Sequence, residues 1–552
     1  MSQIDAKHDA LEVVRGYHER TKHQLQQYAR GPETLDWEAP PAPFRRFVGA
    51  PEVPLPGLTA AEAGLRGALE RSVGERAVGS PLAFSLASLG ALFALSVGVT
   101  AWKQQGPDRW AVRANPSSGN LHPIEAYVLV AGVGFLQTGV YHYRAEDHVL
   151  EQRALWHGTF TGSPRVWVAL TSIAWREAWK YGERSFRYCQ LDTGHAMAAF
   201  GYAAALFGWH VREQMQVGSE TLRLVLGLDR EQDFARVRRP ETEHEEPEVL
   251  LELTPDVQVG SRGALEAPEL RRLAAEARFF GQASTIDPHP MYSWPVVKEV
   301  ALATRWPDAP ARAAEPESAS APLPLIFSHG AQASAAGLIL GRRSAQRFDG
   351  RFVLGREAFA ELLKAAASSA PARASLDLLL FVHRVEALTP GVYLLPCSHG
   401  EPARSLFARL KPRFDPRPVA GFEDPALFEV ATLAPQELAR SARALHCHQD
   451  IAANCCFALA MLADLEQALQ LGSDYRRLLR EAGSLGQTLY LQAEALGVRG
   501  TGIGCFFDDA VAEEIGLRRT AVRSVYHFSV GKPIDDLRIQ TSPPLGLGEE
   551  AS

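Results

Sequence analysis

Cysteine is scarce in this sequence, with six residues among 552, and no two cysteines have the C-x-x-C spacing. The sequence therefore offers neither the disulfide framework of small secreted domains nor paired metal ligands. His446-Cys447-His448 lies near Cys455 and Cys456, but adjacent side chains on a strand or helix point in different directions. We predict no metal site and a reducing, cytoplasmic location.

Long apolar runs and an excess of positive charge are also absent. The longest apolar stretch, Pro81 to Ala101, is broken by Ser85, Ser88, Gly90, Ser96 and Gly98. It predicts a buried helix and loop and not a membrane span. The polar segment Met1 to Asp9 lacks the apolar region of a targeting peptide. A net charge of -7 gives no reason to expect nucleic acid or an anionic membrane as a partner.

The chain is too long for one ordinary core, and its patterns alternate between helix and strand. Helices are predicted at Ala10 to Tyr28, Arg187 to Leu206, Ile451 to Leu469 and Ser484 to Leu496. Strands are predicted at Ala126 to Ala131, Val166 to Thr171, Val249 to Leu253, Leu378 to Val382 and Val525 to Val530. These patterns indicate an α+β fold.

A segment rich in Ala, Pro, Ser and Glu, Ala309 to Pro324, indicates a linker between two halves. We predict a helical extension at 1–45, a first domain at 46–255, a linker at 256–330 and a second domain at 331–552. Glu70-Arg71-Ser72-Val73 opens the first half and Arg342-Arg343-Ser344-Ala345 opens the second. Fusion of two similar domains would leave such a repeat.

The first cluster with chemical potential is Arg342-Arg343-Ser344-Ala345-Gln346-Arg347-Phe348. Guanidinium groups beside a hydroxyl suit a phosphate monoester, because arginine offers a bidentate fork and serine adds a neutral donor. A solvated helix start is the alternative.

The second cluster is Gly500-Thr501-Gly502-Ile503-Gly504-Cys505-Phe506. Its glycines allow a backbone to approach a flat ligand closely. The spacing differs from the dinucleotide-binding fingerprint. The alternative is a tight turn after the helix that ends at Gly497.

The third cluster is Arg113-Ala114-Asn115-Pro116-Ser117-Ser118-Gly119-Asn120-Leu121-His122-Pro123. Two prolines stiffen the backbone around hydroxyl and amide groups that can contact a heteroaromatic ring. A structural turn is the alternative.

The fourth cluster runs from Lys180-Tyr181 to Tyr188. A lysine next to a tyrosine can transfer protons if desolvation lowers the lysine pKa. Ordinary ion pairing between Glu183 and neighbouring arginines is the alternative.

Together these clusters resemble the nitroreductase superfamily, specifically its SagB-type thiazole/oxazole dehydrogenase branch. The arginine-serine opening resembles the family's phosphate-binding start, and Pro116 to Pro123 resembles its flavin-ring loop. Gly502-Ile503-Gly504 resembles its glycine turn, and Lys180-Tyr181 resembles the Lys-Tyr motif of azoline-oxidising members. The resemblance extends from Arg71 to Arg538.

In this family FMN lies between two subunits, so the resemblance implies an internal pseudo-dimer of two nitroreductase-like domains. The second half has the phosphate-binding residues and the glycine turn, but Pro371 to Ser375 replaces the loop. The first half has the loop, but Gly208 to Arg212 has lost most of the turn's glycines. Each half keeps what the other lacks, which predicts one complete FMN site and one empty site.

The resemblance also implies residue roles. Arg342, Arg343, Ser344 and Arg538 would bind the phosphate, and Gln346 lies where many relatives carry a cation near the pyrimidine edge. Gly502, Ile503 and Gly504 would lie near flavin N5, and Cys505 replaces the usual second glycine. Pro116, Ser117, Ser118 and Asn120 would contact the ring from the other half. Lys180 and Tyr181 would be the base and its orienting group.

These roles predict an FMN-dependent dehydrogenase that passes a hydride from a heterocyclised peptide or small metabolite to flavin N5, with O2 or another acceptor reoxidising the flavin. One alternative is an NAD(P)H-dependent reductase of nitroaromatics, quinones or enones, which needs no protein base. Another is a non-catalytic scaffold of a modification complex.

Overall fold

The two halves of the chain repeat one topology. The computed structural model describes residues 3–72, 80–157, 164–255, 266–309, 334–369, 376–397, 410 and 414–544. The first sheet has the order β11-β7-β6-β5-β8-β10-β9, with β2 also pairing with β7, and the second has the order β15-β16-β14-β13-β17-β19-β18. Strands β6, β5, β8, β10 and β9 of the first half correspond, in the same chain order, to β14, β13, β17, β19 and β18 of the second. This confirms the predicted pair of α+β domains.

The first sheet is formed by β2 (Glu52–Pro54), β5 (Ile124–Ala131), β6 (Gly139–Arg144), β7 (Val149–Leu155), β8 (Arg165–Ser172), β9 (His210–Glu213), β10 (Glu246–Thr254) and β11 (Arg278–Phe279). The second sheet is formed by β13 (Asp377–Val382), β14 (Gly391–Pro396), β15 (Arg417–Glu423), β16 (Ala426–Thr432), β17 (Phe457–Asp464), β18 (Arg499–Ile503) and β19 (Val522–Gly531). The central strands of both sheets are buried along nearly their whole length. Their sequences are therefore nearly continuous apolar runs and do not alternate between apolar and polar residues.

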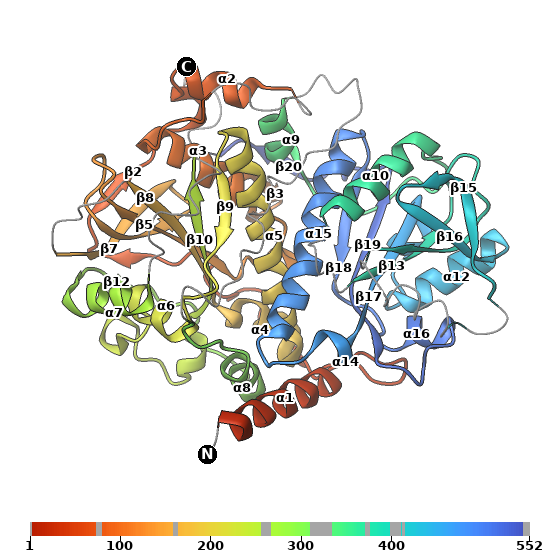
Figure 1. Ribbon diagram of the computed structural model, residues 1–552, viewed down its shortest axis with the longest axis horizontal. Coiled ribbons are helices and arrows are strands. Elements are labelled where there is room, and N and C mark those ends of the chain that lie inside the picture. Colours follow the sequence, from red (N-terminus) through yellow and green to blue (C-terminus); the bar gives the residue numbers. More distant parts are fainter. Residues whose placement is uncertain are drawn as a thin grey trace.

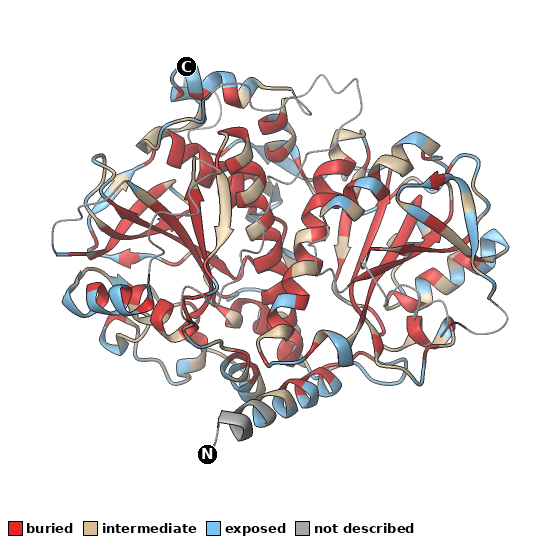
Figure 2. Ribbon diagram, in the orientation of Figure 1, coloured by how far each residue is buried: buried red, intermediate tan, exposed pale blue. Residues whose placement is uncertain are grey.

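Two long helices lie between the sheets, α5 (Ser185–Leu206) and α15 (Asp474–Ala495), each of 22 residues. Helix α5 has apolar residues around its whole circumference, as expected for a helix enclosed on all sides. Figure 1 shows the two helices side by side at the centre of the molecule, and Figure 2 shows that this centre is buried. Two glycines allow the close crossing, because Gly194 faces the backbone of Arg480 and Gly483 faces the backbone of Leu191.

The other helices cover the sheets. In the first half α3 (Leu86–Ser96) contributes with α5 to the core on the inner face of the sheet, and α6 (Ser219–Val225) and α7 (Ala267–Glu276) contribute to the outer core. In the second half α10 (Arg356–Ser369) packs on the inner side, and α12 (Pro435–Leu445) and α16 (Ala510–Glu514) pack on the outer side. Helices α1 (Gln3–Arg20), α4 (Ala174–Tyr181) and α8 (Pro295–Ala303) contribute to the core that spans both halves. Within the described part of the chain, no helix has both the length and the apolar character that a membrane span requires.

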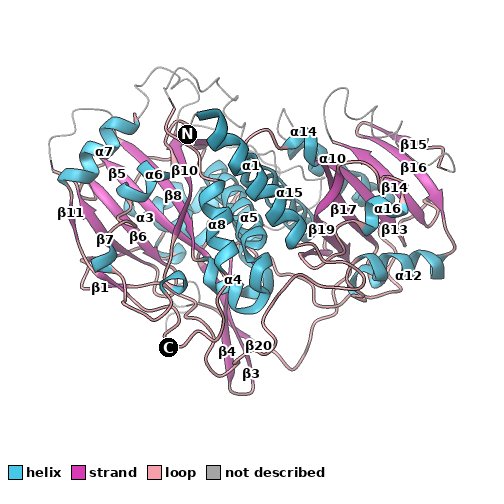
Figure 3. Cartoon of the chain, turned by 90° about the horizontal axis from the view of Figure 1, so that it is seen from below, coloured by secondary structure: helices cyan, strands magenta, loops and turns pink. Residues whose placement is uncertain are grey.

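Two segments of the second half belong structurally to the first. Helix α9 (Ala335–Gly341) packs against α2 (Ala63–Glu70), and its Ala335, Ala336 and Ile339 are buried in the first half's core. Near the C-terminus, β20 (Gln540–Ser542) pairs with β3 (Val99–Gln105), which also pairs with β4 (Asp108–Arg113). Figure 3 shows this small sheet projecting below the central helices. The two halves are therefore interlocked.

One predicted helix is wrong. Residues 451–469 form only short helical segments, α13 (Ile451–Asn454) and α14 (Leu465–Ala468), on either side of strand β17. The residues of β17 are mostly helix formers, but the strand lies between β13 and β19 and is buried on both faces. Tertiary packing here overrides helix propensity. The N-terminal helix also lies earlier than predicted, at Gln3–Arg20 and not 10–28.

Part of the predicted linker is folded. Residues 266–309 contain α7, β11, α8 and β12 (Gln282–Ala283), which pairs with β1 (Phe47–Val48). Strand β11 extends the first sheet. Most of the Ala- and Pro-rich segment, residues 310–324, lies outside the described residues, as do Val73 and Pro371 to Ser375.

Candidate active site

The arginine-serine segment and the glycine-rich segment of the second half lie side by side. The amide of Ala345 donates to the carbonyl of Gly500 at 3.0 Å. The hydroxyl of Tyr490, on α15, is 2.9 Å from Oγ of Ser344 and accepts from the amide of Gly502 at 2.8 Å. The fold thus brings together two clusters that are about 160 residues apart in sequence, and Tyr490 connects them.

Arg342 joins this arrangement to the first half. The residue caps α9, its side chain is buried, and its guanidinium donates to the carbonyls of Ala114 (2.9 Å) and Arg113 (3.0 Å). These carbonyls belong to the chain just before the loop of Pro116 to Asn120. The remaining nitrogen, Nη1, is buried without a protein partner. Arg343 donates mainly to carbonyls of its own segment, including that of Leu340 at 2.8 Å.

The first-half loop is held in an unusual backbone conformation. Gly119, Asn120 and His122 have φ values of 62°, 60° and 49°, in the left-handed region that residues other than glycine rarely adopt. Asn120 stabilises this conformation, because its amide donates to the carbonyl of Ala111 at 2.8 Å and its Oδ1 lies 3.0 Å from Nε2 of His122. Pro116 is buried, Ser117 and Ser118 are half-buried, and Asn120 is exposed. Such local strain is found most often at functional sites.

The end of α4 lies against this loop. A Cβ placed on Gly119 would be 2.5 Å from the hydroxyl oxygen of Tyr181 and 3.3 Å from Nζ of Lys180. Only glycine leaves room for both side chains there. The structure therefore places the predicted Lys-Tyr pair directly beside the predicted ring-binding loop.

The glycine-rich segment is not the turn that the sequence suggested, because Arg499–Ile503 form β18 at the edge of the second sheet. Its glycines make room for tyrosine rings. A Cβ on Gly502 would lie 1.8 Å from the hydroxyl of Tyr526, and one on Gly504 would lie 2.2 Å from the ring of Tyr188. The ring of Tyr188 also packs at a tilt against that of Tyr181, with 4.6 Å between the ring centres, which links this strand to the Lys-Tyr pair.

Two buried carboxylic acids lie beneath the loop. Oγ of Ser117 donates to Glu177 at 3.4 Å, and the amide of Ser118 donates to Asp192 at 3.3 Å. Burial raises the pKa of both groups, and for Glu177 the neighbouring Asp192 adds to the rise. Like charges this close cannot both ionise without cost, so the pair holds a proton near neutral pH.

The buried acids also influence the pKa of Lys180, which lies three residues after Glu177 on α4. Burial lowers the pKa of Lys180, and a charged Glu177 would raise it. Because the raised pKa of Glu177 leaves that group largely neutral, its opposing effect is weak. Burial also raises the pKa of Tyr181 well above its usual value, so Tyr181 keeps its proton and acts as a hydrogen-bond donor. A lysine whose pKa is lowered therefore lies beside a phenol whose pKa is raised.

The buried acids predict a pH-dependent stability. A carboxyl group with a raised folded-state pKa stabilises the protein at low pH, and this contribution is lost as pH rises from the unfolded value of 4.5 towards the folded one. We expect Glu177→Gln to increase the free energy of unfolding relative to wild type by about 1.4 kcal/mol for each pH unit within that window. Denaturant unfolding at pH 5 and pH 8 would measure the difference, and parallel curves for the two proteins would contradict it.

Two predicted residues are tied less closely to this region. Gln346 is exposed, one residue beyond Ala345. Arg538 is exposed and its guanidinium binds Asp536 at 2.6 Å, on a segment whose Ile534 donates to the carbonyl of Arg347. Among the described residues, neither side chain has a hydrogen bond to Gly502 or Ser117.

Sequence patterns missed several residues at the centre of this region. Tyr490, Tyr526, Glu177 and Asp192 belong to no recognised motif, and helix and sheet packing alone brings them here. Asp192 gave one usable signal, since it is the one acidic residue of α5, a helix in which most residues are apolar. Buried ionisable groups with shifted pKa values concentrate at functional sites.

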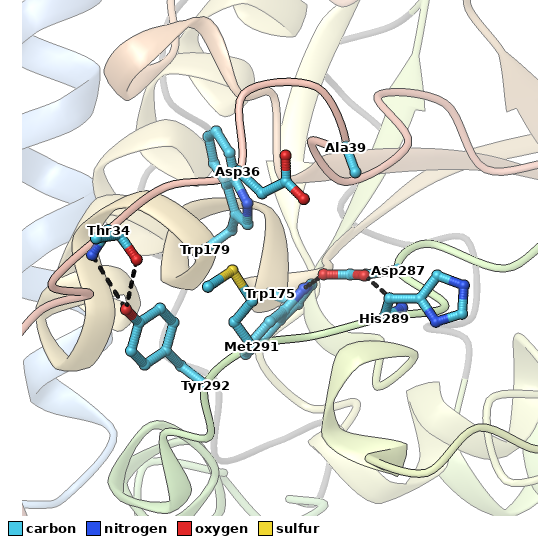
Figure 4. Close-up of a pocket in the computed structure, with 9 residues that line it drawn as sticks. All are labelled: Thr34, Asp36, Ala39, Trp175, Trp179, Asp287, His289, Met291 and Tyr292. Atoms are coloured by element: carbon cyan, nitrogen blue, oxygen red, sulfur yellow. Dashed lines mark hydrogen bonds between the residues drawn. The ribbon is translucent and has the colours of Figure 1, made fainter.

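A shallow pocket, with room for little more than a water molecule, lies next to α4. Figure 4 shows Trp175 and Trp179 of α4 facing Met291 and Tyr292 across it. Trp37 packs edge-on against Trp179 at 5.3 Å, and Nζ of Lys180 lies 5.6 Å from the centre of the Trp37 ring. The N-terminal segment and the segment around Met291 thus form an aromatic wall beside Lys180.

Comparison with known proteins agrees with this architecture. Residues 339–532 match the sequence model of the nitroreductase family. The crystal structure of a protein of Anabaena variabilis assigned to the nitroreductases superposes on 95% of this chain and 99% of its own, with a TM-score of 0.67 and 20% sequence identity. At that identity the likeness shows the fold, and it shows it for both halves together.

Two curated proteins are similar over shorter stretches. The trifolitoxin-processing protein TfxB of Rhizobium leguminosarum bv. trifolii is 31% identical over 133 residues, 21% of this chain and 36% of that protein. A protein of Methanocaldococcus jannaschii assigned to the nitroreductases is 29% identical over 99 residues, 16% of this chain and 50% of that protein. The chain thus spans between 36% and 50% of the length of these relatives.

Proposed function

We propose that this chain is an FMN-dependent dehydrogenase of the nitroreductase superfamily, with one composite site per chain. The match of residues 339–532 to the nitroreductase family model supports the family assignment. The substrate would be a heterocycle carried on a peptide, or a similar small molecule. The observation that supports this proposal best is the convergence at Gly119. The intact loop of the first half, the Lys180-Tyr181 pair and, through Tyr188, the glycine strand of the second half meet there.

The residues present suit FMN. Nη1 of Arg342 is a buried donor without a protein partner, and Ser344 adds a hydroxyl beside it in sequence. Gly502 and Gly504 pack against Tyr526 and Tyr188, so a side chain at either position would displace a tyrosine of this region. Arg342, Arg343, Ser344, Gln346, Arg538 and Gly502 to Gly504 would hold the phosphate and one side of the ring. Pro116, Ser117, Ser118 and Asn120 would hold the other side. When bound, FMN supplies a hydride acceptor at N5.

Lys180 would remove the proton that leaves the substrate as the hydride departs. Its amine accepts a proton at Nζ, and burial favours the neutral form that can do so. The face of Trp37 then stabilises the ammonium group that forms. Tyr181 keeps its proton and orients the substrate by donating a hydrogen bond. The aromatic side chains next to α4 would contact the part of the substrate that extends outward.

The test uses the FMN-loaded protein and a synthetic peptide that carries one thiazoline ring. Under anaerobic conditions the peptide should bleach the flavin absorbance, and the thiazole product should appear in equal amount. We expect Lys180→Ala to slow bleaching by about 10²- to 10⁴-fold, the usual contribution of a general base, with no change in FMN content. Lys298→Ala, an exposed position on α8, is the matched control and should behave as wild type.

Three outcomes would contradict the proposal. Equal bleaching rates for Lys180→Ala and wild type would remove Lys180 from the mechanism. Bleaching by NADH or NADPH, but not by the thiazoline peptide, would favour a reductase that needs no protein base. A protein that takes up no FMN from excess cofactor would be a scaffold and not an enzyme of this class.

A further inference from the structure

Two thiols from distant segments face one another next to the glycine strand. Cys447 lies between α12 and α13, and Cys505 follows β18 directly after Gly504. Their loops are bonded together on both sides, because the amide of Phe507 donates to the carbonyl of Leu445 at 3.1 Å and the side chain of Gln449 donates to the carbonyl of Cys505 at 2.9 Å. These two links bring Cys447 and Cys505 next to each other, and the neighbouring Cys447 thiol lowers the pKa of Cys505.

The pair differs from the other cysteines of the chain. Cys189, Cys397, Cys455 and Cys456 are buried, and burial raises the pKa of each of their thiols. Cys447 and Cys505 are only partly buried, so both can be reached from solvent. The backbone at Cys447 and His448 is left-handed, with φ of 53° and 59°, a conformation that costs free energy for residues with side chains. Elsewhere in the described residues no three histidine, cysteine or acidic side chains are grouped to hold a metal, and this cluster does not form such a group either.

The groups around Cys505 stabilise its thiolate. The hydrogen bond from Cys447 is the main cause of a lowered pKa at Cys505, and His23 and Arg184 contribute. The Nδ1 atom of His23 accepts from the amide of Ala29 at 2.9 Å, so the ring proton is on Nε2 and can be donated to the sulfur. Asp508 does not cancel this effect, because its carboxylate is already bound by Arg184 and Arg187. Conversely, the pKa of Cys447 is raised, so Cys447 remains the protonated partner.

We propose that Cys505 and Cys447 are a redox-active thiol pair that reduces small disulfides. The Cys505 thiolate attacks one sulfur of a disulfide RSSR, which forms a mixed disulfide and releases one RS⁻. The sulfur of Cys447 then attacks the sulfur of Cys505, which forms the Cys447–Cys505 disulfide and releases the second RS⁻. The proton of Cys447 and one from solvent convert both leaving groups to thiols, so two electrons pass from the protein dithiol to RSSR.

This activity is independent of the proposed flavin chemistry, but the two sites are adjacent. The carbonyl of Gly504, the residue before Cys505, accepts from the hydroxyl of Tyr188 at 3.2 Å and from Arg184 at 3.3 Å. A disulfide at Cys505 would fix the backbone at this point. The oxidation state of the pair would therefore affect the strand that carries Gly502 and Gly504.

The test treats the reduced full-length protein with glutathione disulfide, blocks remaining thiols with iodoacetamide and maps the peptides by mass spectrometry. In wild type we expect a peptide in which Cys447 is linked to Cys505. In Cys447→Ala the reaction should stop at one glutathione on Cys505. In Cys505→Ala the modification of Cys447 should be at least about tenfold slower, because the thiolate is the nucleophile. Cys397→Ala, which changes a buried thiol, should still form the link.

A second measurement, the rate of iodoacetamide labelling in native protein, keeps the test valid if a cysteine variant folds poorly. The iodoacetamide reaction of Cys505 in native protein at pH 6 should slow by at least about tenfold in Cys447→Ala, because the thiolate loses its main hydrogen bond. Equal labelling of both cysteines without a link, or a glutathione adduct that forms only in denaturant, would overturn the proposal. Repeating the mapping with FMN-free and FMN-loaded protein separates this result from the flavin proposal, since the link should form in both.

Discussion

Arg342→Ala should empty the flavin site, whereas Arg71→Ala should leave about one FMN per chain. Arg342 holds the carbonyls of Arg113 and Ala114 and so fixes the first-half loop to the second half. Hydrogen bonds from a charged group contribute about 1.5–3 kcal/mol each, so the loss of two should weaken FMN binding by about a hundredfold or more. Released flavin per chain, measured by absorbance after dialysis, would show the effect.

Arg71 is a strict control because it occupies the equivalent position in the opposite half. It caps α2 as Arg342 caps α9, the two helices pack together, and its guanidinium donates to the carbonyl of Leu206 at 2.9 Å. If Arg71→Ala, and not Arg342→Ala, removed the flavin, the complete site would lie in the opposite pseudo-symmetric position. Two FMN per wild-type chain would show that the second site also binds flavin.

Gly194→Ala should destabilise the protein strongly, while Gly201→Ala on the same helix should not. A Cβ on Gly194 would lie 2.1 Å from the carbonyl oxygen of Arg480 on α15, where helix backbone cannot move aside easily. Overpacking typically costs about 1–3 kcal/mol, and a clash with helix backbone belongs at the upper end of that range. A Cβ on Gly201 would meet nothing within 4 Å. Alanine there should raise the free energy of unfolding by up to about 1 kcal/mol, because it has the higher helix propensity. Denaturant unfolding of both variants measures this.

Gly194→Ala and Gly201→Ala also test whether FMN affinity depends on the contact between α5 and α15. Separating α5 from α15 would move Asp192 and Tyr188 away from Tyr490 and the glycine strand. We therefore expect Gly194→Ala to lose FMN affinity together with stability, although it touches no predicted cofactor residue. Similar unfolding curves for Gly194→Ala and Gly201→Ala would show that the helices can separate at little cost.

Local patterns in the sequence predicted the two-domain α+β fold and most of the central strands correctly. They failed at β17, where helix-forming residues take the strand conformation because both faces are covered. They also suggested a turn at Gly500 to Gly504, where the glycines instead let Phe528, Tyr526 and Tyr188 pack against an edge strand. In both places long-range packing, which one sequence does not reveal, decides the local structure.

In the candidate site, too, local motifs were predicted from the sequence and the contacts made by long-range packing were not. Motifs identified the loop, the Lys-Tyr pair and the glycine strand, because each has a local spacing. The sequence does not show that Glu177 and Asp192 lie close together, because they belong to different helices, α4 and α5. Only the fold brings both acids to the same loop, where they bind Ser117 and Ser118. Tyr490 was missed for a similar reason, because its hydroxyl acquires a role only through the contact with Ser344 and Gly502.

The pairing of β20 with β3 determines when this molecule can be completed during its synthesis. Residues 540–542 form the edge of a sheet whose other strands are made more than 400 residues earlier. The core of the first half is also incomplete until α9 has been made, because Ala335, Ala336 and Ile339 are buried in it. A nascent chain can form its first sheet early, but the edge of β3 stays unpaired until residues 540–542 have been made. Ribosome-bound chains that stop before Gln540 should therefore expose β3 to proteases that the released protein resists.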